Sequence, residues 1–208
     1  MTETIGPYSF TQDRRLSQDS SQKITADTLL LSEFVLPLLI EDKEASVIEL
    51  GTATGAIAFA LCAKSSVEKF TGVEVNKDAF DIFAANIEAN SLGSRIEAVN
   101  SDWRELYDLY PRGTFGVVVC NPPYMKRGEG RVSPNPARAM ARSETLGELR
   151  DLVDISAYLA GDSGSICYVF PIKRREELIE ELKRVGFEVE RMEEVDGGKL
   201  FLVEARGR

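Results

Sequence analysis

Short apolar runs alternate along the chain with segments whose apolar residues recur every three or four positions. The first pattern is typical of buried strands and the second of helices that pack one face against a sheet. Strands are predicted over residues 45–50, 69–75, 95–99, 114–120, 164–170, 187–193 and 199–205. Helices are predicted over residues 55–64, 78–90, 146–160 and 174–185, with an earlier helix beginning near Thr25.

The order of these elements predicts the architecture. Strands that alternate with helices are joined by right-handed crossovers, so they form a parallel sheet with helices on both faces. The last two strands flank Asp196-Gly197-Gly198, a hairpin-type turn, and must therefore run antiparallel to each other. We expect an α/β fold with a doubly wound sheet of about seven strands, mostly parallel with one reversed. No linker divides the chain, which predicts a single domain over 1–208, with an arm and helix in 1–44 and the core in 45–208.

Composition narrows the possible chemistry. The chain has 208 residues, 43% of them hydrophobic and 28% charged, which is typical of a soluble globular protein. No apolar run is long enough to span a membrane and no secretory signal follows Met1, so a cytoplasmic location without membrane contact is expected. The chain has no histidine, and Cys62, Cys120 and Cys167 lie far apart. An imidazole base and a histidine or zinc-cysteine site are thereby excluded, and no metal is expected.

Candidate ligand-binding residues follow the first predicted strand. Open α/β sheets bind ligands at the carboxyl ends of their strands. There, Glu49 is followed by Gly51, Ala53 and Gly55, whose small side chains allow a tight turn and close approach of a ligand to the backbone. The loop lacks the longer glycine pattern of dinucleotide sites, which favours an adenosine ligand without phosphates.

The next two strand ends extend this series. Glu74 ends the second strand, where a carboxylate can accept hydrogen bonds from both ribose hydroxyls. Asp102 and Trp103 follow the third strand, where they can bind the amino group of adenine and stack on its ring. Each residue alone has a simpler interpretation, as a turn, an exposed charge or a helix cap. The ordered series at successive strand ends favours the adenosine site.

The fourth strand ends in Asn121-Pro122-Pro123-Tyr124. Two prolines stiffen the strand end and remove two backbone donors. The side-chain oxygen of Asn121 and the carbonyl of Pro122 can then both accept from one planar amino group, on which Tyr124 can stack. Accepting both protons directs the nitrogen lone pair at an electrophile, so these three residues are the candidate catalytic residues.

Taken together, these motifs resemble the class I S-adenosylmethionine-dependent methyltransferases, whose fold is Rossmann-like. The resemblance implies S-adenosyl-L-methionine as cofactor, held by Glu49, Gly51, Ala53, Gly55, Glu74, Asp102, Trp103 and Asn121. Ala53 departs from the usual pattern, in which a glycine stands at that position, and alanine resists positive φ. By a further analogy, Lys23, Thr25 and Asp27 are expected near the methionine end of the cofactor.

The segment after Tyr124 bears on the substrate. Its basic residues, opposed by Glu129 alone, are Lys126, Arg127, Arg131, Arg138 and Arg142. In a chain of net charge −9, this local excess indicates contact with phosphates, whereas a solvated loop is the simpler interpretation. Residues 22–30, 121–124 and 130–144 together resemble the bacterial tRNA (adenine-N6)-methyltransferases, which implies a tRNA adenine near the anticodon as target. The family commonly has histidine where Ser143 stands.

Other targets remain open on the sequence. A protein glutamine methyltransferase acting on a peptide release factor would use the same Asn-Pro-Pro-Tyr chemistry on an amide, and the acidic net charge favours a protein partner. DNA or a small molecule is a further possibility. The fold can also serve as a non-catalytic scaffold that binds S-adenosylmethionine, although an intact acceptor motif argues against it.

Overall fold

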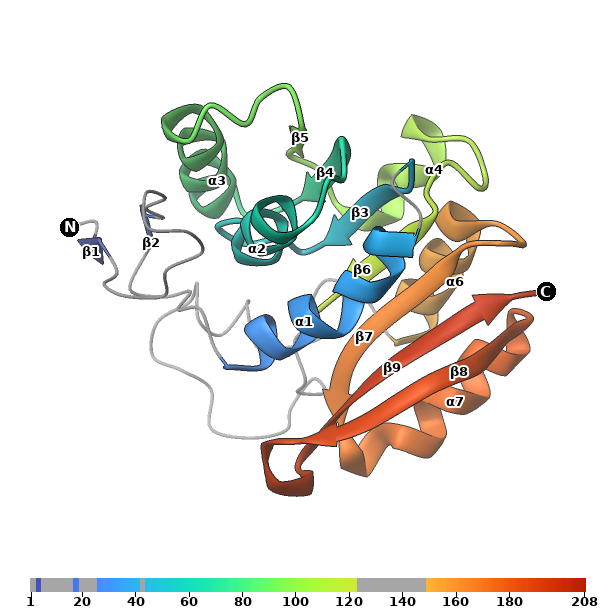
Figure 1. Ribbon diagram of the computed structural model, residues 1–208. Helices are drawn as coiled ribbons and strands as arrows, with labels where there is room; N and C mark the ends of the chain where they lie inside the picture. Colours follow the sequence, from blue (N-terminus) through green and yellow to red (C-terminus); the bar gives the residue numbers. More distant parts are fainter. Residues whose placement is uncertain (1–2, 5–16, 19–25, 42–43, 123–148) are drawn as a thin grey trace.

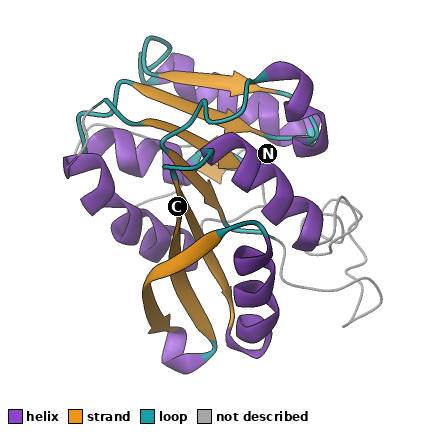
Figure 2. Ribbon diagram, turned by 90° about the vertical axis from the view of Figure 1, so that its right-hand side faces the viewer, coloured by secondary structure: helices purple, strands orange, loops and turns teal. Residues whose placement is uncertain are grey.

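The centre of the molecule is a twisted β-sheet with helices on both sides (Figures 1 and 2). The computed structural model describes residues 3–4, 17–18, 26–41, 44–122 and 149–208. Within this part of the chain the sheet has seven strands in the order β5-β4-β3-β6-β7-β9-β8. In chain order they are β3 (Ser46–Leu50), β4 (Lys69–Val73), β5 (Ile96–Val99), β6 (Val117–Cys120), β7 (Ser165–Pro171), β8 (Phe187–Val195) and β9 (Leu200–Gly207).

Strand directions confirm the predicted fold class. The strands from β5 to β7 are parallel to their neighbours, whereas β9 is antiparallel to both β7 and β8. One strand of the sheet is therefore reversed, as predicted. The chain leaves β3 to form β4 on one side and later returns to form β6 on the other side, so the strand order reverses between β3 and β6. This is the position at which open α/β sheets bind ligands.

Two hydrophobic clusters cover the two faces of the sheet. The first includes buried residues of α1 (Ala26–Glu41), α2 (Ala56–Lys64) and α3 (Lys77–Ala89). The second includes buried residues of α4 (Leu106–Leu109), α6 (Leu149–Ala160) and α7 (Arg175–Arg184). Neighbouring strand residues alternate between them, since Val47 belongs to the first cluster and Ile48 to the second. Burial on both faces explains why the parallel strands read as continuous apolar runs.

Three short 3₁₀ turns complete the described elements: η1 (Trp103–Glu105), η2 (Ile172–Arg174) and η3 (Asp196–Gly198). The last of these is the predicted hairpin connection, in which Asp196, Gly197 and Gly198 all have positive φ. A pair of two-residue strands, β1 (Glu3–Thr4) and β2 (Ser17–Gln18), was not predicted and forms its own antiparallel ladder. None of the helices described here is long and apolar enough to cross a membrane.

Helix α1 crosses the sheet in front of β6 and β7 (Figure 1) and continues through Pro37, which is exposed. Proline interrupts the backbone hydrogen bonds of the preceding turn. In that turn, the guanidinium of Arg191 from β8 donates to the carbonyl of Phe34 and lies 3.8 Å from the centre of its ring. Arg191 also pairs with Glu204 at 3.2 Å. These contacts fix α1 against the sheet.

Candidate functional site

The loop after β3 has the backbone conformation that a close ligand approach requires. Gly51, Ala53 and Gly55 have φ angles of 75°, 53° and 94°. A Cβ placed on Gly51 would meet no atom of the described residues within 4 Å, so open space adjoins the backbone at that residue in this part of the chain. Ala53 adopts the left-handed conformation although it carries a Cβ, so the loop keeps the same left-handed turn at this residue as at its two glycines. Asn86 of α3 donates to the carbonyl of Thr54 at 3.1 Å and holds the far end of the loop.

Gly55 has a packing role in addition. A Cβ at this position would lie 2.3 Å from the ring of Phe83, and a Cβ on Gly72 of β4 would lie 2.5 Å from the same ring. Phe83 of α3 is fully buried. The absence of side chains at Gly55 and Gly72 therefore leaves room for the ring of Phe83 between α3 and the sheet. This packing was not predicted from the sequence.

Glu74 is a buried carboxylate that joins two strand ends. Its side chain accepts from the backbone N–H of Ala53 at 2.8 Å and from that of Asn76 at 2.8 Å. The residue is 7% exposed, and burial raises the pKa of its carboxyl. Asn100, after β5, donates to the backbone carbonyl of Glu74 at 2.7 Å. Glu74 thus supports the loop after β3, a role beyond the ribose contact predicted for it.

Glu49 is buried near the carboxyl end of β3, beside Leu50. It is 3% exposed and accepts from the hydroxyl of Thr52 at 2.7 Å. Burial raises the pKa of Glu49 to about 8, the Thr52 hydrogen bond opposes this rise, and the charge of Glu74 adds to it. A pKa of about 8 favours the protonated form of Glu49 at neutral pH, so its buried side chain is a neutral polar group and not a fixed negative charge.

Asp102 and Trp103 lie after β5, at the same edge of the sheet. The carboxylate of Asp102 accepts from the backbone N–H of Arg104 at 3.0 Å and from its guanidinium Nε at 2.9 Å, and the Arg104 side chain holds the pKa of Asp102 below its usual range. Asp102 thus caps η1, the simpler interpretation noted for it. Trp103 packs against the second cluster, and its indole Nε1 is buried with no hydrogen-bond partner in the described part of the chain.

Asn121 follows β6 directly and lies next to the loop after β3. In the register of the two strands, Cys120 is opposite Leu50, so Asn121 and Gly51 extend neighbouring strand ends. The side-chain Nδ2 of Asn121 donates to the hydroxyl of Thr28 in α1 at 3.2 Å. Pro122 is buried. The first turn of α1, which also contains Asp27, thereby reaches the carboxyl end of β6.

The structure brings most of the predicted cofactor residues together at the carboxyl-terminal ends of the parallel strands. Four adjacent strands contribute, in the order β5, β4, β3 and β6. The residues placed together are Asp27, Glu49, Gly51, Ala53, Gly55, Glu74, Asp102, Trp103, Asn121 and Pro122. The remaining candidates, which lie outside the described residues, are Lys23, Thr25, Tyr124, Lys126, Arg127, Arg131, Arg138 and Arg142.

Sequence reasoning missed Thr28 as a part of this site. Leu31, Val35 and Leu39 of α1 are fully buried and form one face of the helix. Thr28 lies three residues before Leu31, so it is the polar first position of the same face. A polar residue at the start of an otherwise apolar helix face is the signal that could have identified it.

This arrangement has features that suit transfer to a neutral amino group. An amide and a buried strand end adjoin an open glycine loop, and the carboxyl groups of Glu49 and Glu74 already accept hydrogen bonds from the protein. The acceptor nitrogen would be aligned by hydrogen bonds to oxygens, and its lone pair would need no prior deprotonation.

Comparison with known proteins identifies a family of methyltransferases. The family model described as the methyltransferase small domain matches residues 23–143. A release factor glutamine methyltransferase of Agrobacterium fabrum is 36% identical over 104 residues, which is 48% of this chain and 35% of that protein. A tRNA1(Val) (adenine(37)-N6)-methyltransferase of Flavobacterium psychrophilum is 22% identical over 172 residues, which is 83% of this chain and 71% of that protein. The chain thus spans about a third of the first relative and about seven tenths of the second.

Solved structures agree on the fold. TYW2 of M. jannaschii, crystallised in complex with AdoMet, superimposes with a TM-score of 0.64 at 14% identity, over 99% of this chain and 85% of that chain. The matching family model covers more than half of the chain, and its limits enclose the glycine loop, Glu74, Asp102 and Asn121. The chain therefore belongs to the methyltransferase small domain family.

Proposed function

We propose that the chain is an S-adenosylmethionine-dependent N-methyltransferase that acts on an exocyclic amino group, with adenine-N6 of a tRNA near the anticodon as the target. The observation that carries this proposal is the position of Asn121, at the end of β6 beside the glycine loop of β3. The proposed domain extends over 1–208, in which residues 1–44 cover the cofactor site.

The residues present fit the cofactor. Open space at Gly51 leaves room for a ligand against bare backbone, and Glu74 ends the adjacent strand as the family pattern requires. Asp102 and Trp103 would bind the adenine, while Asp27, with Lys23 and Thr25, would lie near the methionine end. When bound, S-adenosylmethionine supplies a methyl group on a sulfonium, which is an electrophile that needs no metal or base.

The acceptor side is assigned to Asn121, Pro122 and Tyr124. The side-chain oxygen of Asn121 and the carbonyl of Pro122 would each accept one proton of the amino group, and Tyr124 would stack on the ring that carries it. These oxygens would hold the acceptor nitrogen toward the methyl group that the bound sulfonium would supply, with the cofactor leaving as a neutral thioether. The methylated nitrogen would carry the positive charge, and one of its protons would then pass to solvent water.

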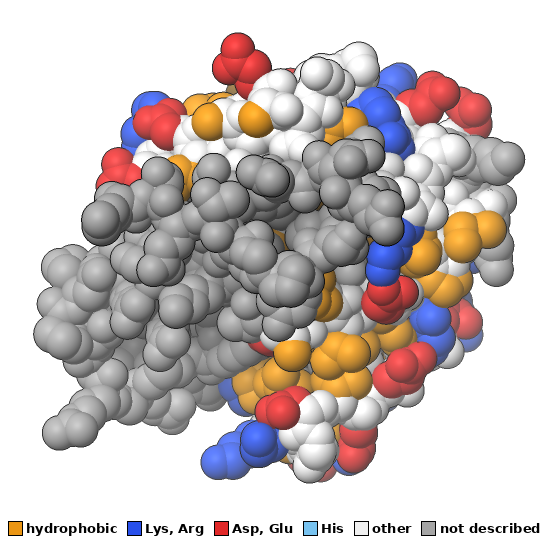
Figure 3. All heavy atoms as spheres, turned by 60° about the vertical axis from the view of Figure 1, so that its left-hand side comes forward, with side chains coloured by type: hydrophobic (Ala, Val, Ile, Leu, Met, Phe, Trp, Pro, Cys, Tyr) orange, Lys and Arg blue, Asp and Glu red, His pale blue; other side chains and the backbone are white. Residues whose placement is uncertain are grey.

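Two considerations favour RNA over protein. Similarity to the tRNA methyltransferase relative extends over 83% of the chain, whereas the matches to release factor methyltransferases extend over 48% to 74%. On the face shown in Figure 3, acidic and basic side chains of the described residues are interspersed. Phosphate contacts are therefore assigned to Lys126, Arg127, Arg131, Arg138 and Arg142, which form the basic segment of the sequence.

A release factor glutamine remains the second candidate. The 36% identity to the release factor glutamine methyltransferase is the higher of the two identities, and the net charge of −9 suits a protein partner. A planar carboxamide presents the same NH₂ geometry to Asn121 as adenine does.

The test is to incubate the protein with methyl-labelled S-adenosylmethionine and either unmodified tRNA transcripts or release factor, and then digest each product. We expect label in N6-methyladenosine, and its loss in Asn121→Ala with cofactor affinity changed less than about threefold, because Asn121 aligns the acceptor. Label in release factor alone would contradict the RNA target and support the amide target. Cofactor binding without label in either substrate would favour the scaffold.

A further inference from the structure

Thr28 contacts the side chain on which the proposed chemistry depends. Its hydroxyl oxygen lies 3.2 Å from Nδ2 of Asn121, and the two residues are separated by 93 positions in sequence. We propose that Thr28 is a positioning residue that fixes the orientation of the Asn121 carboxamide for methyl transfer. This inference rests on the proposed function, since the orientation matters only if Asn121 aligns an acceptor.

The chemistry explains why orientation matters. A carboxamide has a donor end and an acceptor end on opposite sides of its central carbon. An incoming amino group must meet the oxygen, because the NH₂ end would place donor against donor. The contact with Thr28 holds the nitrogen toward α1 and so leaves the oxygen directed away from α1.

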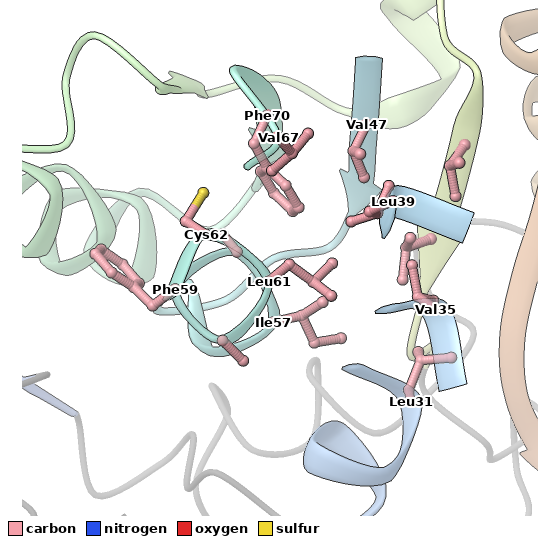
Figure 4. Close-up of a cluster of buried hydrophobic side chains, with 14 of the residues drawn as sticks. Leu31, Val35, Leu39, Val47, Ile57, Phe59, Leu61, Cys62, Val67 and Phe70 are labelled. Atoms are coloured by element: carbon pink, nitrogen blue, oxygen red, sulfur yellow. The ribbon is translucent and has the colours of Figure 1, made fainter. Parts of the chain in front are cut away.

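The helix that carries Thr28 packs firmly against the neighbouring helix α2. Leu31, Val35 and Leu39 form the face of α1 that packs against Ile57 and Leu61 of α2 (Figure 4), and all five side chains are buried. Thr28 is the polar first position of this face, so packing of the apolar positions brings its hydroxyl to the strand end.

The strand end is rigid as well. Asn121 is followed by buried Pro122, whose ring restricts the backbone conformation of the preceding residue. With its backbone restricted, the amide end of Asn121 retains rotation about its side-chain bonds. The hydrogen bond that Asn121 donates to Thr28 on this buried helix restricts that rotation before the substrate binds, which is preorganisation of the acceptor site.

Ser32 provides a matched control on the same helix. It is buried, and its hydroxyl donates to the carbonyl of Leu29 within α1 at 2.7 Å. Removing this hydroxyl alters α1 by a similar amount without touching Asn121. The variants are therefore Thr28→Val, which removes the hydroxyl at similar volume, Thr28→Ser, which restores it, and Ser32→Ala.

The first measurement needs no substrate. Asparagine occurs at six positions of the chain, so selective ¹⁵N labelling of asparagine gives six side-chain amide signals, and the Asn121→Ala variant identifies that of Asn121. We expect Thr28→Val to move the Asn121 signal and speed its hydrogen exchange. We expect Thr28→Ser and Ser32→Ala to leave it in place. An Asn121 signal identical in the wild type and Thr28→Val overturns the inference.

The second measurement is turnover on the substrate labelled by the wild type. We expect Thr28→Val to lower kcat by about five- to tenfold, the effect of one lost hydrogen bond, with cofactor affinity unchanged. Thr28→Ser should recover most of this loss, and Ser32→Ala should retain wild-type kcat. If Thr28→Val retained wild-type kcat while Asn121→Ala was inactive, the role of Thr28 would be overturned and the proposed function would stand. A wild type that methylates no substrate would overturn the proposed function as well.

Discussion

At the scale of single residues, Ala53 has an unusual backbone conformation. Its φ of 53° is in the left-handed region, where an L-residue with a Cβ is disfavoured by about 1–2 kcal/mol. Its backbone N–H nevertheless donates to the buried carboxylate of Glu74. The surrounding hydrogen bonds therefore determine the conformation of the loop at this residue.

We predict that Ala53→Gly stabilises the protein by about 0.5–1 kcal/mol, since glycine relieves the strain but loses more conformational entropy on folding. Urea unfolding measures the change. Gly51→Ala is the converse control, because its φ is 75° and its surroundings are open, so backbone strain alone should destabilise it. A destabilised Ala53→Gly would contradict this account.

Glu49 predicts a dependence of stability on pH. Burial raises its pKa from 4.5 to about 8, so the folded chain keeps a proton that the unfolded chain releases above pH 4.5. The stabilisation from protonated Glu49 is complete below about pH 4.5 and is lost as the pH rises to about 8.

Glu49→Gln cannot ionise and should escape this loss. We expect its free energy of unfolding, relative to the wild type, to increase by about 2–4 kcal/mol between pH 4.5 and pH 8.5. Chemical unfolding of both proteins across this range measures the difference. A difference that is constant with pH would show that Glu49 has an ordinary pKa.

At the scale of elements, the ring of Phe83 is a main contact between α3 and the sheet. Phe83 occupies the space beside Gly55 and Gly72, and Gly72 has no positive φ. Substitution of Gly72 therefore isolates the steric effect from backbone strain. The same ring contacts the start of α2, where it lies edge-to-face with Phe59.

We predict that Gly72→Ala destabilises the protein by about 1–3 kcal/mol, because a Cβ there would overlap the ring of Phe83. Gly93→Ala, in open space, is the control and should be nearly neutral. Gly72→Ala should cost less stability in a Phe83→Leu background than in the wild type, because the smaller leucine side chain leaves room for the new Cβ. Additive effects of the two changes would rule out the clash.

The elements themselves could be predicted well from the sequence. All seven strands of the sheet and the reversed strand agree with the apolar runs and the turn at Asp196. The limits differ by a few residues, as for β4, which ends at Val73 where 75 was predicted, because the bond from the N–H of Glu74 to the carbonyl of Val99 is the last one between β4 and β5. The predicted helix over 146–160 agrees with α6 from Leu149 onward.

The contacts between elements could not be predicted in the same way. The alternation of apolar and polar residues records which face is buried, but it does not record which partner a side chain meets. Thr28 on Asn121, Phe83 on Gly72 and Arg191 on Phe34 each join residues distant in sequence. The positions of Glu74 and Asn121 at strand ends were predictable, whereas their hydrogen-bond partners required the fold.

At the scale of the whole molecule, charge separates the proposed RNA contacts from the rest of the surface. The chain has a net charge of −9, so a phosphate backbone is repelled unless cations gather locally. Residues 126–142 contain five basic residues. A second basic run, Lys173-Arg174-Arg175, is already paired in part, because Arg174 binds Glu177 and Arg175 binds Glu194.

We predict that replacing Arg131, Arg138 and Arg142 by alanine weakens tRNA binding and reduces its dependence on salt. Each phosphate contact contributes about 0.7–0.9 to the slope of log affinity against log salt concentration, so three lost contacts should reduce the slope by about 2–3. Filter binding or fluorescence anisotropy between about 50 and 200 mM salt gives the slope. Cofactor affinity should stay unchanged.

The control for this experiment is Lys173→Ala/Arg175→Ala, which removes two positive charges from η2 and α7. Because Arg175 pairs with Glu194 at 3.2 Å, we expect the slope of this variant to equal that of the wild type. A reduction of the slope in both variants, in proportion to the charge that each removes, would show that tRNA responds to net charge alone. A full slope in the triple variant would remove residues 126–142 from the RNA interface and would leave the adenine target without its phosphate contacts.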